Sequence, residues 1–194
     1  MGNKILIIST PRTGSYSLLL GISSAMGYPK LSEPFNTTLW KTTLPLVYED
    51  TPKVIKTIIN QVPSYDLNPI DYYIEFCKNF DTIILLSRKD LKSVAESYAH
   101  QTTHSKNNIW HLPYSFNENG VDIDSAYYDC EEMNKKLIQL SEKIKIEIDW
   151  YEDIYSGDIK KIDYFLKKHS LNLNKELFLK YINPSRRLRQ FKII

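Results

Sequence analysis

The sequence KILIISTPRTGSYSLL, residues 4–19, predicts a buried strand, a tight turn and the start of a helix. Lys4–Ser9 is a short aliphatic run closed by a turn signal, which is typical of a buried strand. From Ser15 to about Met26, large apolar residues recur at helical spacing, and Gly27 stands where the helix would be capped. This strand–turn–helix unit is the start of an alternating α/β pattern.

The rest of the chain repeats the alternation of strands and helices. Further strands are predicted at 54–59, 81–87 and 144–148, and helices at 70–79, 91–103, 124–143, 158–169 and 174–181. Asp90 is the expected N-cap of the helix 91–103, and residues 105–121 form an expected surface loop. Alternating strands and helices predict an α/β fold in three layers, with a central parallel sheet flanked by helices.

Length and composition limit the class of protein. The chain has 194 residues, of which 42% are hydrophobic and 25% charged, so we expect one globular domain spanning 1–194. Its unbroken aliphatic runs are too short for a transmembrane helix, and no signal-peptide core is recognisable. Cys77 and Cys130 lie far apart without a CxxC pattern, which argues against a disulfide framework or a zinc site. These features predict a cytoplasmic protein.

Charge favours a local anion site over a broad basic surface. The net charge of +2 is too small to favour nucleic acid or a membrane surface as the partner. The first 32 residues contain no acid, and the last eleven contain only basic charges, including Arg186. If both ends meet in space they form a basic site; otherwise they are two solvated segments.

The turn at residues 11–17 has the chemistry of a phosphate-binding loop. A helix N-terminus presents unpaired amides and a partial positive charge, and Gly14 lets the backbone approach an anion closely. Arg12 adds a fixed charge, while Ser15 and Ser17 add hydroxyl donors. A nucleoside-triphosphatase loop would read GxxxxGK[ST], and here both the first glycine and the lysine are missing.

Two other segments are expected beside this loop. Arg88 ends the predicted strand 81–87, and residues 150–153 follow the strand 144–148. Ligands of open α/β sheets bind at the carboxyl ends of the strands. Three candidate segments at one edge of the sheet predict a ligand site there.

This combination of motifs resembles the sulfotransferases that use 3′-phosphoadenosine 5′-phosphosulfate (PAPS). Residues 11–19, PRTGSYSLL, are similar to their 5′-phosphosulfate loop, and Arg88 followed by Ser97 is similar to their 3′-phosphate motif. Residues 32–36, SEPFN, resemble a Glu-Pro-Phe segment of bacterial and carbohydrate-type members, and residues 151–153 resemble their YED segment. The resemblance implies a P-loop-NTPase-like sulfotransferase fold.

The resemblance also implies roles for individual residues. It assigns Glu33 as the general base and Arg12 as the cation at the transferred group. The cofactor would contact the loop residues Arg12, Thr13, Gly14, Ser15, Tyr16 and Ser17, the 3′-phosphate residues Arg88 and Ser97, and Tyr151 near the adenine. Arg186 in the basic tail would complete the 3′-phosphate site. The reaction would transfer a sulfuryl group from PAPS to a hydroxyl of a small molecule, sugar or lipid, without a metal.

The sequence departs from the family at several points and leaves alternatives open. Cytosolic phenol and steroid sulfotransferases have lysine where Arg12 stands, which favours the bacterial and carbohydrate-type branch. The Arg88-to-Ser97 interval is one residue longer than theirs, so Ser93 or a motif starting at Lys89 is an alternative. No glycine follows residues 185–187 as the family motif would have it.

The base, the acceptor pocket and the activity also have alternatives. His104 or His111 could serve as the base in place of Glu33, and residues 36–50 and 105–121 are expected to shape the acceptor pocket. His100 and His104 have the spacing of metal ligands, but no third ligand is evident in the sequence. Two other functions fit the anion loop: a small-molecule kinase with a degenerate loop, or a non-catalytic nucleotide-binding protein.

Overall fold

The computed structural model describes residues 3–35, 45–64, 66–106 and 122–183. Its strands are β1 (Lys4–Ser9), β2 (Lys30–Ser32), β3 (Lys53–Ile58), β4 (Thr82–Ser87) and β5 (Ile148–Trp150). Its helices are α1 (Ser15–Met26), α3 (Pro69–Cys77), α4 (Leu91–Lys106), α5 (Ile123–Ile144), α6 (Tyr151–Ile154), α7 (Ile159–Lys168) and α8 (Lys175–Ile182).

The five strands form one sheet in the order β2-β3-β1-β4-β5, and every neighbouring pair is parallel. β1 lies at the centre, between β3 and β4. All strands therefore end at the same edge, so the segments that follow β1, β3, β4 and β5 emerge together. The predicted α/β class and three-layer arrangement are confirmed.

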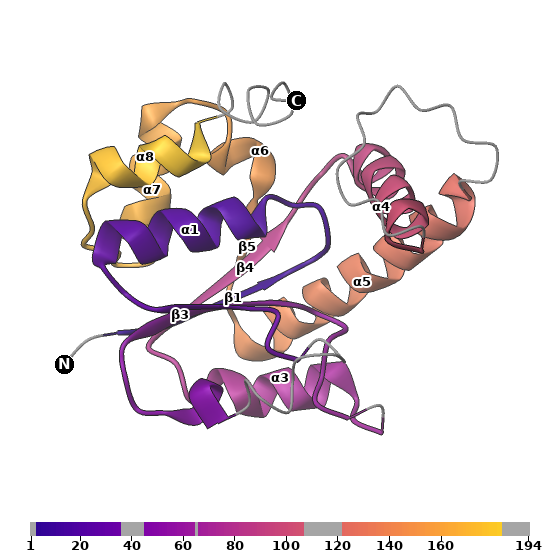
Figure 1. Cartoon of the computed structure of the whole chain (residues 1–194), viewed down its shortest axis with the longest axis horizontal. Coiled ribbons are helices and arrows are strands. Elements are labelled where there is room, and N and C mark those ends of the chain that lie inside the picture. The colour runs from indigo at the N-terminus through magenta and orange to yellow at the C-terminus, as the bar shows by residue number, and fades with distance from the viewer. Residues whose placement is uncertain (1–2, 36–44, 65, 107–121, 184–194) are drawn as a thin grey trace.

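Helices cover both faces of the sheet (Figure 1). α1, α7 and α8 lie on one face, and α3 and α5 lie on the other, while α4 stands beyond the carboxyl edge. Consecutive side chains of β1 alternate between these layers, as the period of a strand requires. Ile5 and Ile7 pack in the core with α1 and α8, whereas Leu6 and Ile8 pack in the core with α3 and α5.

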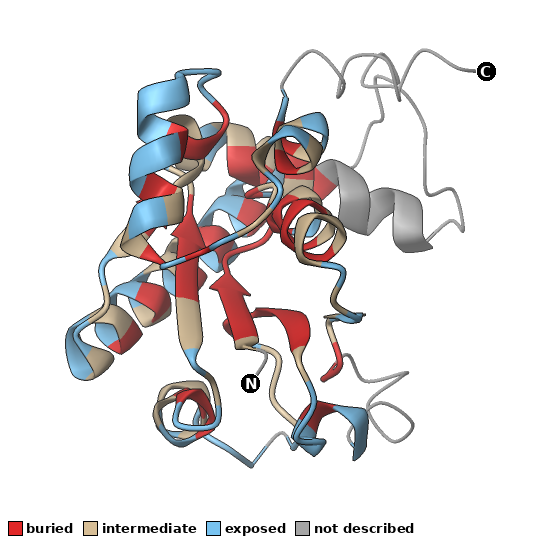
Figure 2. Ribbon diagram, turned by 90° about the vertical axis from the view of Figure 1, so that its left-hand side faces the viewer, coloured by how far each residue is buried: buried red, intermediate tan, exposed pale blue. Residues whose placement is uncertain are grey.

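The buried residues lie where the sheet and the helices on its two faces pack together. β3 is buried throughout, β1 and β4 are buried except at their first residues, and several helices have one buried and one exposed side (Figure 2). The burial of apolar surface on both faces of the sheet stabilises the fold. Among the described residues, no helix is long and apolar enough to cross a membrane.

The first predicted unit is confirmed residue by residue. β1 and α1 have the expected bounds, and Gly27 ends α1 in a left-handed conformation (φ 70°), with its amide bonded to the carbonyl of Ser23. Asp158 and Asn174, the predicted first residues of two later helices, are their N-caps in the structure, and their side chains accept hydrogen bonds from the first turns.

The prediction of a strand at 144–148 is wrong at its start. Ile144 is the last residue of α5, Lys145 reverses the chain with a φ of 57°, and β5 begins only at Ile148. Ile144 follows Leu137 and Leu140 at helical spacing and packs with them in the core, so the helix continues to it. The apparent alternation of isoleucines belongs to a helix end and its turn.

Candidate functional site

The loop between β1 and α1 is a compact turn built from its own backbone contacts. Gly14 has a φ of 74°, which glycine adopts without strain, and Arg12 has a φ of 57°, which costs a non-glycine residue free energy. The buried hydroxyl of Thr13 donates to the carbonyl of Thr10 over 2.9 Å. Because α1 begins six residues after the carboxyl end of β1, its first amides, which have no partner within the helix, lie at the carboxyl edge of the sheet.

Arg12 joins this loop to α4. Its Nε donates a hydrogen bond to Oγ of Ser97 over 2.7 Å, although the two residues are 85 positions apart. Ser97 is buried, with 8% of its surface exposed. Arg12 and Ser97, which the resemblance assigned to two separate phosphate motifs, are thus in direct contact.

The hydroxyl of Ser93 is used differently. Its Oγ donates to the carboxylate of Asp90, and its amide donates to the same carboxylate over 3.1 Å. Asp90 therefore caps α4 as predicted, with Ser93 in the cap. Of the two candidate serines on α4, Ser97 is the one that contacts the loop.

Glu33 lies in a short polar network with the end of β3. Its carboxylate accepts hydrogen bonds from Nζ of Lys56 and, over 2.8 Å, from Nε2 of Gln61. Gln61 is itself fixed, because its Oε1 accepts from the amide of Ile58 over 3.2 Å. The carboxylate is therefore oriented by two donors at the carboxyl edge.

Lys56 is a buried cation inside this network, with 4% of its surface exposed. Burial lowers its pKa below the ordinary value, and the negative charge of Glu33 opposes that shift. The positive charge of Arg12 lowers the pKa further, so its guanidinium lies within electrostatic reach of Lys56. Glu33 and the anion loop are thus parts of one charged neighbourhood.

Arg88 lies at the end of β4, beside the segment after β5. Its guanidinium covers the ring of Tyr151 at 4.8 Å from the ring centre, and its Nε is 3.9 Å from Oε1 of Glu152. That Nε is buried and makes no hydrogen bond within the part of the chain that the structure describes. A buried N–H without an acceptor is costly, so this group has the capacity to donate one further hydrogen bond.

Two aromatic residues connect this segment to the loop. Tyr151 stacks on Tyr155 with ring centres 4.6 Å apart, and the hydroxyl of Tyr155 donates to the carbonyl of Gly14 over 2.7 Å. Glu152 accepts hydrogen bonds from the amides of Lys89 and Asp90 and so anchors the start of α4. The segments after β1, β4 and β5 therefore meet, as the parallel topology predicts.

Most of the predicted site residues lie in this neighbourhood, but they differ in exposure. Thr13 and Ser15 are buried, Gly14 and Ser17 are partly buried, and Tyr16 is 53% exposed. Arg186, His111 and the segments 36–44 and 107–121 lie outside the described residues, as do the side chains of His100 and His104. No group of three or more metal-ligating side chains occurs in the ranges that the structure describes.

Sequence reasoning missed four residues of the site. They are Lys56, Gln61, Tyr155 and Asn134, whose Oδ1 accepts from the hydroxyl of Ser87 over 2.8 Å. Of these four, only Lys56 could have been found from the sequence, because a charged residue inside the apolar run KVIKTI needs a partner when it is buried. The other three depend on contacts between segments that are distant in the sequence.

Comparison with known proteins supports the fold. No family model matches the sequence, and no curated protein matches it significantly. A sulfotransferase domain from the curacin biosynthetic pathway aligns over 91% of this chain and 77% of its own, with a TM-score of 0.55 and 15% sequence identity. A gluconokinase from Sinorhizobium meliloti 1021 aligns over 74% of this chain and 95% of its own, with a TM-score of 0.32 and 13% identity. The fold therefore resembles that of a sulfotransferase domain.

Proposed function

We propose that this chain is a sulfotransferase that moves the sulfuryl group of PAPS to a hydroxyl of an acceptor molecule. The observation that carries the proposal is the 2.7 Å contact between Arg12 and Ser97. It joins the loop that resembles a 5′-phosphosulfate site to the serine that resembles a 3′-phosphate ligand. The resemblance of the fold to a sulfotransferase domain is consistent with this reading.

The residues present fit the bisphosphorylated nucleotide that such a reaction needs. The loop amides and Arg12 would hold the 5′-phosphosulfate, and Arg88 and Ser97 would hold the 3′-phosphate. The buried Nε of Arg88, which has no acceptor among the described residues, supports that assignment. Tyr151, which the resemblance puts near the adenine, packs against Arg88 and Tyr155 and would therefore approach the nucleotide together with the 3′-phosphate residue Arg88.

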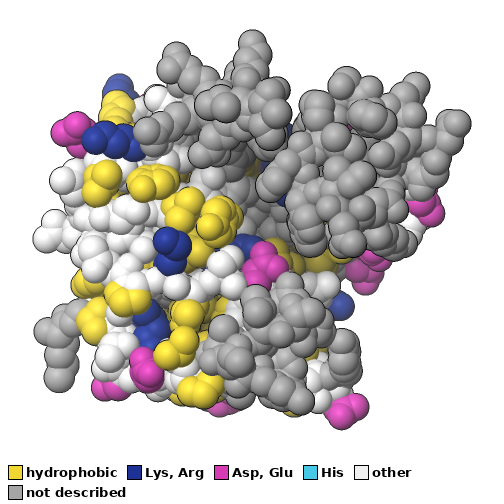
Figure 3. All heavy atoms as spheres, viewed as in Figure 1, with side chains coloured by type: hydrophobic (Ala, Val, Ile, Leu, Met, Phe, Trp, Pro, Cys, Tyr) yellow, Lys and Arg dark blue, Asp and Glu magenta, His cyan; other side chains and the backbone are white. Residues whose placement is uncertain are grey.

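Binding would depend on these specific groups and not on a general positive field. On the face shown in Figure 3, Lys and Arg side chains are scattered among acidic and hydrophobic ones wherever described residues are visible. The net charge of +2 agrees with this distribution. A nucleotide with phosphate groups at both the 3′ and the 5′ position would therefore be selected by the loop and by Arg88.

Transfer would proceed by in-line displacement, with charge developing on the leaving phosphate oxygen. When bound, PAPS supplies the sulfuryl group and a stable bisphosphate leaving group. Arg12 and the amides of residues 13–17 stabilise the developing charge. Glu33 takes the proton of the attacking hydroxyl, while Lys56 and Gln61 hold its carboxylate in place. The new S–O bond forms to the acceptor oxygen as the S–O bond to the 5′-phosphate breaks.

A thermal-shift titration tests the proposal first. The probes are 3′,5′-adenosine bisphosphate, AMP, and ATP with Mg²⁺. A ligand at 100 times its Kd adds about 2.7 kcal/mol, which is roughly a 5–11 °C rise for a domain of this size. We expect that rise with the bisphosphate and little with AMP. A rise only with ATP and Mg²⁺ would favour a kinase, and binding of the bisphosphate without transfer to any acceptor would favour a non-catalytic protein.

A further inference from the structure

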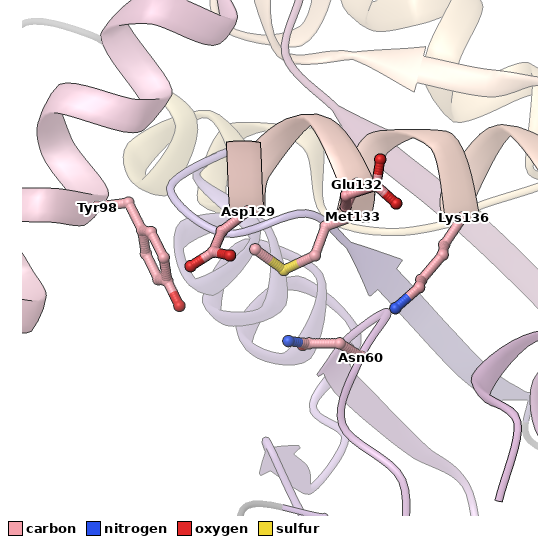
Figure 4. Close-up of a pocket in the computed structure, with 6 residues that line it drawn as sticks. All are labelled: Asn60, Tyr98, Asp129, Glu132, Met133 and Lys136. Atoms are coloured by element: carbon pink, nitrogen blue, oxygen red, sulfur yellow. The ribbon is translucent and has the colours of Figure 1, made fainter. Parts of the chain in front are cut away.

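A cavity of about 180 Å³ lies between the end of β3 and the helices α4 and α5. It is lined by Asn60, Tyr98, Asp129, Glu132, Met133 and Lys136 (Figure 4). Asn60 comes from the turn after β3, Tyr98 from α4, and the other four from α5. None of these residues has a role in the nucleotide site described above.

Three lining residues of the cavity come from the same chain segments as residues of that site. These three directly neighbour site residues in the sequence: Asn60 precedes Gln61, Tyr98 follows Ser97, and Met133 precedes Asn134. Gln61 donates to Glu33, and Ser97 accepts from Arg12. Because consecutive Cα atoms are about 3.8 Å apart, the cavity is lined by the same segments that contact the proposed base and the anion loop.

Three of the polar side chains around the cavity have no partner in the part of the chain that the structure describes, and two of them, Asn60 and Asp129, are exposed to solvent. The side chains of Asn60, Asp129 and Lys136 make no hydrogen bond or ion pair within the described ranges. Figure 4 shows Asp129 opposite Tyr98, and the amine of Lys136 directed toward the turn that carries Asn60. Glu132 is directed away from this turn, and its carboxylate accepts from Lys135 over 2.9 Å.

We propose that this cavity binds the acceptor and that the acceptor is a neutral polyhydroxylated ring of the sugar type. The inference rests on the proposed sulfuryl transfer. Asp129 accepts hydrogen bonds from hydroxyls, Lys136 donates to them, and the Asn60 amide does both. Of the three charged residues that line the cavity, Glu132 is paired with Lys135, and the charges of Asp129 and Lys136 balance, so neither an anion nor a cation is favoured.

Other acceptor chemistries fit the lining less well. A purely apolar alcohol would leave Asn60, Asp129 and Lys136 desolvated without partners, and a site of this kind rejects such analogues strongly. The Tyr98 ring and the Met133 side chain provide the apolar surface that the C–H face of a sugar ring needs. Whole small-molecule ligands occupy pockets of about 300–1,000 Å³, so this cavity holds one ring, with the rest of the acceptor outside.

Ligand-observed NMR tests the inference without needing turnover. The probes are neutral methyl hexopyranosides, a phenol and an amino alcohol, each added to the protein with 3′,5′-adenosine bisphosphate present. We expect saturation transfer to the glycosides and binding roughly tenfold weaker in Asn60→Ala, Asp129→Ala and Lys136→Met. Glu142→Ala and Lys143→Met, which change exposed charges on α5 away from the cavity, should bind like the wild type.

The outcomes separate the two proposals. The cavity variants should keep the full thermal shift with the bisphosphate, which shows that they fold and retain the nucleotide site. Glycoside binding that is absent, or that is unchanged in all three cavity variants, overturns the inference. So does preferential binding of the phenol or the amino alcohol. Suppose that the wild type shows no thermal shift with the bisphosphate but its glycoside binding is still weakened by Asp129→Ala. That result would overturn the sulfotransferase proposal and support the sugar site on its own.

Discussion

Nζ of Lys56 donates to the carboxylate of Glu33, and the amide of Glu33 in turn donates to the carbonyl of Lys56. The pair fixes the segment after β2 against β3. The two partners differ in burial, because the Lys56 side chain is 4% exposed and the Glu33 side chain is 32% exposed. Removing either partner therefore has a different consequence.

Glu33→Ala should destabilise the protein more than Lys56→Met does. Loss of the carboxylate leaves a buried ammonium unpaired, which costs about 3 kcal/mol or more, whereas loss of the lysine leaves a partly solvated carboxylate that Gln61 still contacts. The double variant should recover part of the loss. Urea unfolding of the four proteins gives a coupling free energy, which we expect at about 1–3 kcal/mol.

The exposed pair of Glu75 and Lys78 on α3 provides the matched control. Its side chains are 69% and 65% exposed, so its coupling should be about 0.5 kcal/mol or less. Equal coupling in both pairs would contradict a buried ion pair at Lys56.

Arg12→Ala should lower turnover by about 100-fold or more, because one charge-stabilising donor at the transferred group is lost. Arg12→Lys keeps the charge but loses the planar donor that reaches Ser97, so we expect an intermediate rate. Single-turnover kinetics with labelled PAPS measure the chemical step. Turnover near the wild-type rate in Arg12→Ala would remove this residue from the mechanism.

Glu33→Gln should abolish most turnover while keeping the affinity for 3′,5′-adenosine bisphosphate. Glutamine keeps the shape of the side chain but accepts no proton from the acceptor hydroxyl. Calorimetric binding beside the transfer assay separates the two effects. A parallel loss of binding and turnover would indicate that Glu33 acts through the Lys56 network alone.

Ser97→Ala and Ser93→Ala form a matched pair on one helix. Ser97 contacts Arg12, so its removal should weaken bisphosphate binding about tenfold. Ser93 contacts Asp90 at the helix start, so its removal should change only stability, by roughly 0.5 kcal/mol. Calorimetry with the bisphosphate compares them, and the reverse order of effects would assign the motif to Ser93.

The sequence predicted the parts of this molecule that local patterns determine. The run of aliphatic residues 5–8, bounded by a turn signal, is typical of a central strand, and Gly14 and Gly27 mark where the chain turns. The convergence of the segments after β1, β4 and β5 followed from the parallel topology. These inferences needed no knowledge of contacts between distant segments.

What the sequence could not predict depends on such contacts. β2 has three residues at the sheet edge and no apolar pattern, so only its pairing with β3 defines it. The pairing of Glu33 with Lys56 and the contact of Tyr155 with Gly14 join residues 23 and 141 positions apart. Their chemistry is ordinary, and only the fold brings them together.

Tyr155→Phe should loosen the anion loop without disturbing the aromatic stack. The hydroxyl of Tyr155 donates to the carbonyl of Gly14, and its loss should lower the free energy of unfolding by about 1 kcal/mol. Bisphosphate binding should weaken severalfold because the loop is less fixed. Tyr164→Phe is the control, since that side chain is 66% exposed and should change stability by less than about 0.5 kcal/mol. Wild-type affinity in Tyr155→Phe would show that this contact has no part in holding the loop.

The two buried thiols make stability fall at alkaline pH. Burial raises the pKa of Cys77 from 9.0 to about 12 and that of Cys130 from 9.0 to about 11. The folded protein therefore keeps these protons after the unfolded chain has lost them. The stabilisation is complete below pH 9, decreases as the pH rises above 9, and is exhausted above the folded-state values.

Unfolding free energies at pH 8 and pH 10, measured for the wild type and for Cys77→Ala/Cys130→Ala, test this dependence. The wild type should lose about 1 kcal/mol more per thiol over this interval than the double variant loses. The comparison removes the contribution of tyrosine titration, because both proteins carry the same tyrosines. Native thiols should also react with a disulfide reagent at pH 8 roughly 100-fold more slowly than unfolded ones, since so little thiolate is present. Equal pH dependence in the two proteins, together with rapid native labelling, would show that these cysteines are open to solvent.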